Sequence, residues 1–170
     1  GQDEEVAIRT ISLDFEEVDV FAPPRLFMYE DDEHQKQIAD STRPEAYDET
    51  LSHYVDADEV GDFFLDVFNT GFQTDAFKIR VLEQPDDWQY RFYDNDTGLE
   101  LVEEGIYSTT PDIGSTQILT IMMEVYPPAD RDGVDIGLFK LSVTSKEDSE
   151  LRTDIAFTVH RTFGILVEVI

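Results

Sequence analysis

The stretch "VFNTGFQTDAFKIRV", residues 67–81, decides the fold because it joins two patterns that are typical of β-strands. An apolar run, "FFLDVF" (63–68), ends just before Asn69 and predicts a buried strand. After a short polar step the chain resumes as "AFKIRV" (76–81), in which apolar and charged side chains alternate. We expect Asn69 and Gly71 to form a tight turn, because both residue types tolerate positive φ, with Asn69 capping the turn through its side chain. The stretch is interpreted as a connection between strands, and a ligand contact there is the less favoured alternative.

The same alternation recurs along the rest of the chain. Four more strands are predicted: "WQYRFY" (88–93), "TQILTIMMEVY" (116–126), "GLFKLSVTS" (137–145) and "DIAFTVH" (154–160). Turn signals rich in Gly, Pro and Asp separate them, and no helical pattern of convincing length intervenes. This spacing predicts an all-β fold, an antiparallel β-sandwich. Within it, Trp88, Tyr90 and Phe92 share one face and are expected to fill the core, although such aromatics can also form an exposed platform for sugars.

The chain divides at residue 58 in this interpretation. Residues 1–58 are expected to hold one strand, "VAIRTISLDF" (6–15), and a long irregular or inserted segment that is polar and rich in Pro and Asp. The sandwich itself is assigned to residues 59–170, and the whole chain is expected to form a single domain.

Two smaller expectations concern the irregular segment and the end of the chain. The segment allows a short helix around 32–39 or 45–53, with "RLFMY" (25–29) packing onto the sandwich. The last residues, "RTFGILVEVI" (161–170), read either as an edge strand of the same sheet or as a strand that continues into a longer protein.

Residues 55–160 carry a series of motifs in a distinctive order. They run from "LDVFNTGFQTDAFKIRV" through Trp88 and "YDNDTGLEL" to "PDIGSTQILTIMMEVYPPADRDGVDIGLFKLSVTS". This order resembles the Ig-like modules of bacterial and archaeal secreted and cell-surface proteins, including the repeats associated with alpha-galactosidases and the adhesion-type repeats. The resemblance implies a sandwich and an extracytoplasmic location. It implies no catalytic residue, and segment 16–58 has no counterpart in it.

The composition of the chain excludes further classes of function. The net charge is −27, from 39 acidic residues against 12 basic ones, of which only four are lysines. Such a surface repels nucleic acid and anionic membranes, and it suits salty water or an extracellular setting. Cysteine is absent, which excludes disulfides and thiolate metal sites, and no apolar run approaches the length of a membrane span. The expected location is extracellular, at the cell surface or periplasmic.

No arrangement of residues predicts catalysis. The three histidines, His34, His53 and His160, occur in dissimilar contexts and belong to no recognisable motif. Pairs of carboxylates are too frequent in this chain to indicate a glycosidase, and no phosphate-binding loop is present. The chain is therefore predicted not to be an enzyme and to need no cofactor, with calcium as the one exception considered.

Acidic loops are the candidate calcium sites, because calcium takes six to eight oxygen ligands. "DRDGVD" offers Asp130, Asp132 and Asp135, and "DNDTG" offers Asp94 and Asp96. A third loop, "VDADEVGD", adds Asp56, Asp58 and Asp62. None matches the twelve-residue helix–loop–helix pattern, so the alternative is a set of solvated acidic turns.

Together these features predict a non-catalytic extracellular Ig-like module that acts as a spacer, an adhesion domain or a protein-interaction domain of a larger protein. The alternative is a carbohydrate-binding accessory module of a glycan-degrading enzyme, which would need exposed aromatic side chains on a sheet face or loop rim. The expected partner is a protein or a glycan at the cell surface, with no nucleic acid and no membrane insertion. An uncovered edge strand would allow a weak dimer of an otherwise monomeric chain.

Overall fold

The computed structural model describes residues 20–43, 53–57, 59–129 and 135–163. These residues form strands and turns and no helix. The strands are β1 (Arg25–Tyr29), β2 (Gln37–Asp40), β3 (His53–Asp56), β4 (Gly61–Phe68), β5 (Phe77–Glu83), β6 (Gln89–Asp94), β7 (Val102–Glu104), β8 (Tyr107–Thr109), β9 (Ile118–Tyr126), β10 (Ile136–Ser145) and β11 (Arg152–Thr162).

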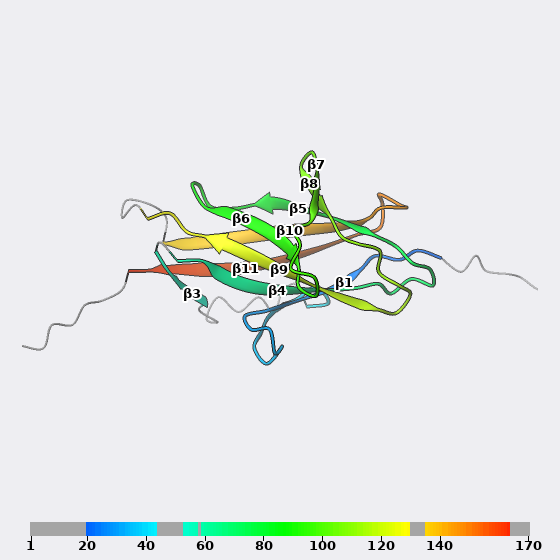
Figure 1. Ribbon diagram of the computed structural model, residues 1–170, viewed down its shortest axis with the longest axis horizontal. Coiled ribbons are helices and arrows are strands. Elements are labelled where there is room, and N and C mark those ends of the chain that lie inside the picture. Colours follow the sequence, from blue (N-terminus) through cyan, green and yellow to red (C-terminus); the bar gives the residue numbers. More distant parts are fainter. Residues whose placement is uncertain (1–19, 44–52, 58, 130–134, 164–170) are drawn as a thin grey trace, which may run out of the picture.

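The strands form two sheets that pack face to face, as Figure 1 shows. One sheet has five strands in the order β2-β1-β4-β9-β6, and the other has six in the order β3-β11-β10-β5-β8-β7. Every pairing is antiparallel except that of β3 with β11, which is parallel. The all-β antiparallel sandwich predicted from the alternation of side chains is thus confirmed.

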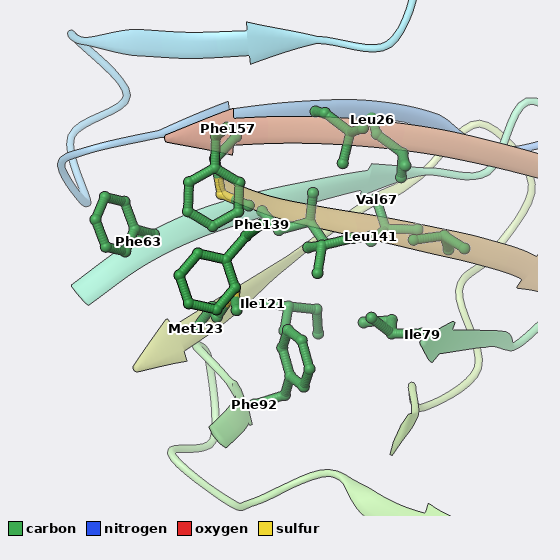
Figure 2. Close-up of a cluster of buried hydrophobic side chains, with 14 of the residues drawn as sticks. Leu26, Phe63, Val67, Ile79, Phe92, Ile121, Met123, Phe139, Leu141 and Phe157 are labelled. Atoms are coloured by element: carbon green, nitrogen blue, oxygen red, sulfur yellow. The ribbon is translucent and has the colours of Figure 1, made fainter. Parts of the chain in front are cut away.

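One hydrophobic core lies between the sheets (Figure 2). Both sheets contribute alternate side chains to it, as the period of two in a β-strand requires: Phe63, Leu65 and Val67 point inward from β4. The stacked rings of Phe139 and Phe157, with centroids 5.4 Å apart, fill its centre from β10 and β11. Trp88 is only 1% exposed and meets Phe139 edge-on, which agrees with the predicted core role of this aromatic group.

The early part of the chain is built into the same core. Strand β1 pairs with β4, and its Leu26 and Met28 are fully buried, so "RLFMY" packs on the sandwich as expected. The helix allowed around 32–39 is not formed. Residues 32–39 instead belong to a hairpin between β1 and β2. Burial of Ile38 follows the period of two of a strand and not the period of a helix.

Several expectations fall outside the described residues: the strand at 6–15, the second helix position over 45–53 except for His53, which begins β3, and the final segment 164–170. Arg161 and Thr162, at the start of the last predicted strand, instead complete β11. The division of the chain at residue 58 stays a prediction.

The stretch 67–81 connects the two sheets. Strand β4 belongs to the five-stranded sheet, whereas β5 belongs to the six-stranded sheet, so the loop between them crosses from one layer to the other. We call residues 69–76 the crossing loop. It is a link between layers and not the turn of a hairpin.

Candidate functional site

Asn69 organises the crossing loop with its side chain. The residue is 1% exposed, and its Nδ2 atom donates hydrogen bonds to the carbonyl oxygens of Gln73 and Ile113, both at 2.8 Å. Its Oδ1 atom accepts a bond of 2.9 Å from the backbone N–H of Gly71. The amide's two donor hydrogens and its acceptor oxygen are therefore all used inside the protein, and the predicted capping role is confirmed.

The prediction that Asn69 and Gly71 adopt positive φ in this turn was wrong. Neither Asn69 nor Gly71 has a positive φ; the described glycines that do are Gly98 and Gly105. Gly71 is required by space instead, because a Cβ atom there would lie 2.9 Å from the carbonyl oxygen of Val20. The side chain of Asn69 bends the chain, and this leaves the backbone in its ordinary region.

The loop containing Asp94 and Asp96 is a structural turn. Asp94 is buried, and its Oδ1 atom accepts hydrogen bonds from the backbone N–H groups of Asp96 (2.9 Å) and Thr97 (3.4 Å). Gly98 supplies the positive φ, at +69°, that closes the turn. One of the two predicted calcium ligands in this loop thus has an oxygen engaged by backbone donors.

In the other predicted calcium loop, Asp130 and Asp132 lie outside the described residues. Asp135 forms an ion pair of 3.0 Å with the guanidinium of Arg161, whose side chain is fully buried and also donates to the carbonyl of Pro128. Within the described ranges, no group of three or more acidic or histidine side chains is placed to hold a metal.

Calcium binding stays a prediction, and a thermal melt at fixed ionic strength tests it. A midpoint that rises with calcium and falls back with a chelator, and that no longer responds in Asp132→Asn, would support a metal site. A rise that sodium or magnesium produces equally would contradict it, because the acidic loops would then respond only to screening.

Two carboxylates stand opposite each other on the outer face of the five-stranded sheet. Asp62 on β4 is in register with Glu124 on β9, and burial, followed by the charge of Glu124, raises the pKa of Asp62. The hydroxyl of Tyr126 donates to Glu124, and this bond raises the pKa of Tyr126 to about 12. Because Asp62 is exposed on an open sheet face, the pair is a local electrostatic feature and offers no enclosed reaction site.

A second polar cluster on that face was not predicted. His34, in the turn between β1 and β2, places Nε2 at 2.8 Å from Oδ1 of Asp66 and Nδ1 at 2.8 Å from the carbonyl oxygen of Asp32. The hydroxyl of Thr120 donates to the same oxygen of Asp66 at 2.7 Å. Both ring nitrogens face acceptors, so the geometry requires the protonated imidazolium. We call His34, Asp66 and Thr120 the hairpin clasp, because they hold the β1–β2 hairpin on the sheet.

Exposed aromatic side chains do not gather into a platform. Trp88 and Phe92 are buried, and Tyr90 is half-buried. Among the described residues, the exposed rings are those of Phe72, 69% exposed, and Tyr54, 61% exposed. Phe72 follows the last residue of β4, whereas Tyr54 belongs to β3, whose Val55 contacts the first residue of β4, so the two rings lie at opposite ends of the sandwich.

Two packed sheets with one shared core define the described part of the chain as an antiparallel β-sandwich. No protein-family model matches the sequence, and no curated protein matches it. None of the described segments forms a helix with the length and hydrophobicity needed to cross a membrane.

Solved structures resemble the fold at low sequence identity. A FixG-related protein from Vibrio parahaemolyticus aligns with a TM-score of 0.46 and 12% identity, covering 62% of this chain and 82% of that one. The N-terminal domain of PorA gives a TM-score of 0.49 and 10% identity over 82% of this chain and 99% of that one. The CupB6 tip adhesin from Pseudomonas aeruginosa gives 0.42 and 8% over 65% and 41%.

Proposed function

We propose that the chain is a non-catalytic extracellular Ig-like module that serves as a spacer, adhesion or protein-interaction domain of a larger surface or secreted protein. The observation that carries this proposal is the path of the chain. Val20 is hydrogen-bonded to Phe72 at one end of the sandwich, and Phe163 follows β11 at the opposite end of the long axis (Figure 1). When the chain enters a module at one end and leaves it at the other, the module separates the domains before and after it by its full length.

The interior of the module supports a rigid role. One core spans strands from β1 to β11, and the buried Asn69 and the hairpin clasp tie loops to the sheets by side-chain hydrogen bonds. The net charge of −27 keeps such a body soluble and separate from other acidic surfaces. An acidic surface with few lysines suits the proposed location outside the cytoplasm, where salt screens its self-repulsion.

The carbohydrate-binding alternative receives less support. It would need exposed aromatic side chains grouped on one sheet face or loop rim. In the part of the chain that the structure describes, the two exposed rings, Phe72 and Tyr54, lie at opposite ends of the sandwich, and Trp88 is in the core. A spacer or protein-interaction module needs no such group.

Spin labels at the two ends of the module test the spacer role. The chain has no cysteine, so Val20→Cys and Thr162→Cys would carry the only labels. We expect one narrow distance distribution near the length of the 11-residue strand β11, roughly 35 Å, because strands rise about 3.3 Å per residue. The distribution should not change between about 0.1 and 1 M NaCl. A broad distribution, or a much shorter distance, would overturn the proposal.

A further inference from the structure

The outer face of the six-stranded sheet carries an unusual share of the chain's positive charge. The chain has only 12 lysines and arginines, and four of them point outward from three adjacent strands of this sheet, while Arg161 on β11 is buried. They are Lys78 and Arg80 on β5, Lys140 on β10 and Arg152 on β11. Glu83 and Asp154 lie among them, so these strands carry more outward cations than carboxylates although the chain has a net charge of −27.

Strand register fixes how these cations surround the middle of the sheet. Thr144 on β10 lies between Lys78 and Arg152, its partners on the two neighbouring strands. Two residues earlier, Ser142 lies between Arg80 and Asp154 in the same way. Neighbouring strands are about 4.8 Å apart, so long cationic side chains flank a narrow floor of two hydroxyl-bearing residues.

Part of this charge is bound in no hydrogen bond or ion pair among the residues that the structure describes. Arg152 is paired with Asp154 through two bonds of 2.7 and 2.9 Å, and the ammonium of Lys78 lies over the ring of Tyr107 at 5.6 Å. Within the described ranges, the side chains of Arg80 and Lys140 form neither a hydrogen bond nor an ion pair. Arg80 is exposed, whereas Lys140 is half-buried and in register with Glu83. The hydrogen bond from Arg152 lowers the pKa of Asp154, and the nearby charge of Lys140 helps to lower it. Arg80 is therefore the cation most available to an anionic partner, with Lys140 beside it on the next strand.

The same face becomes apolar toward the other end of β10. Its outward side chains run Ile136, Leu138, Lys140, Ser142 and Thr144, and the first two are 55% and 41% exposed. They line an open groove together with Leu82 and Pro85, and three polar residues, Glu83, Gln84 and Asp86, complete its lining. Along β10 the outer face therefore changes from apolar side chains at a groove of mixed lining to a cationic patch.

We propose that this face, from the groove at Ile136 and Leu138 to the cations Lys78, Arg80, Lys140 and Arg152, binds an extended acidic polypeptide segment of a partner protein. The segment has apolar side chains at one end and carboxylates at the other. This inference rests on the proposed function as an interaction module and names the chemistry of the partner.

A short peptide fits this face better than a long polyanion. The cationic patch spans only a few strands and is surrounded by an acidic surface, and charges are screened beyond about 8 Å at physiological salt. A peptide of a few residues can stay within the patch, whereas a long acidic polysaccharide would extend over the acidic surroundings. The groove can also bind apolar side chains of a peptide, whereas a uronate chain has no apolar side chains to place there.

A titration of the whole ¹⁵N-labelled chain, followed by NMR, tests the proposal. The probe is an eight-residue peptide with leucine at its first and third positions and glutamate at its fifth, seventh and eighth. One comparison peptide replaces glutamate with lysine, and a trigalacturonate tests the other class of anion. We expect the glutamate peptide to bind, with shifts confined to β5, β10 and β11, and to weaken as salt is raised.

Charge-reversal variants locate the binding surface. The double variant Arg80→Glu/Lys140→Glu should weaken binding of the glutamate peptide about tenfold or more. The matched control, Lys36→Glu/Arg43→Glu, changes the net charge equally on exposed residues elsewhere and should bind like the unchanged chain. Leu138→Asp should weaken binding through the groove while the cations stay in place.

Four results would overturn the proposal: no binding of the glutamate peptide at millimolar concentration, equal binding of the lysine peptide, equal weakening by both double variants, or equal affinity for trigalacturonate. None of them bears on the distance between the spin labels. Failure of the peptide titration and failure of the spacer role are therefore distinguishable.

Discussion

Single side chains close the ends of this sandwich, and Asn69 is the clearest case. Replacing it in Asn69→Ala leaves the buried N–H of Gly71 without its partner. It also removes one bond each from the carbonyl oxygens of Gln73, which is exposed, and Ile113, which keeps the N–H of Asp75. We expect a loss of about 2–4 kcal/mol in the free energy of unfolding, since an unpaired buried group costs about 1–3 kcal/mol and each lost hydrogen bond about 0.5–1.5 kcal/mol. Urea denaturation followed by the fluorescence of Trp88 measures it.

The neighbouring residue provides the control. Thr70 is exposed, and its hydroxyl donates one bond of 3.0 Å to the carbonyl oxygen of Pro23. Thr70→Ala should therefore cost less than about 1 kcal/mol. Equal losses in the two variants would show that the crossing loop depends on its chain path and not on the Asn69 amide.

At the scale of elements, the hairpin clasp makes the attachment of β1 and β2 depend on pH. Burial opposes the charge on His34, but the hydrogen bond and the charge of Asp66 outweigh it, and the pKa of His34 is raised. A raised pKa in the folded state means that the stabilisation is full below the ordinary value of about 6.5 and is lost as pH rises through the folded value. The difference in unfolding free energy between the unchanged chain and His34→Asn should thus shrink from about pH 5.5 to pH 8.5.

Asparagine suits this test because His34 has a φ of +57°, which asparagine tolerates. His160→Asn is the comparison, since that ring packs on exposed Tyr54 and has no carboxylate bonded to it among the described residues. Unfolding by urea across this pH range measures both variants. A difference for His34→Asn that stays constant with pH would contradict the charged clasp.

Strands whose side chains alternate over six or more residues could be predicted from the sequence. β5, β6, β9, β10 and β11 were found because one face of each is buried and the period of two is visible, whereas β4 was found as a continuous apolar run, since both of its faces are buried. β7 has three exposed residues and therefore no pattern to detect. β1 and β2 are short and lie in a polar segment, so only "RLFMY" gave a signal.

Contacts between distant residues could not be predicted in the same way. The parallel pairing of β3 with β11 joins residues about a hundred positions apart, and no local pattern encodes it. Nor did any local pattern place His34 beside Asp66, or gather Arg80 and Lys140 on one face, since both groupings follow from strand register. The alternation in "AFKIRV" did place Lys78 and Arg80 on the outward face.

At the scale of the whole molecule, a net charge of −27 on 170 residues opposes the compact state. We expect the free energy of unfolding to rise with NaCl from about 0.05 to 1 M, and KCl to act equally, because screening weakens the repulsion whatever the cation. Urea titrations at each salt concentration, followed by Trp88 fluorescence, measure the slope. A variant with lysine at four exposed acids, Glu33, Asp86, Asp96 and Glu150, should show a smaller slope. An unchanged slope would contradict the electrostatic explanation.

The arrangement of the two ends predicts how the module responds to force. Val20 precedes β1 at one end of the long axis, and Phe163 follows β11 at the other (Figure 1). Force applied between these ends acts along both strands and loads the hydrogen bonds of β1 with β4 and of β11 with β10 together. We expect a higher unfolding force than between Val20 and Asp148, because the turn at 146–151 lies at the same end as Val20 and the bonds would then break in sequence (Figure 1).

Single-molecule force spectroscopy measures this difference with handles on Val20→Cys/Thr162→Cys and Val20→Cys/Asp148→Cys, since the chain has no other cysteine. Equal forces in the two directions would contradict shear loading of the terminal strands. They would also remove the mechanical advantage of a spacer whose chain enters and leaves at opposite ends. A larger unfolding force along the long axis would mean that the strand order resists force in the direction that the proposed spacer role requires.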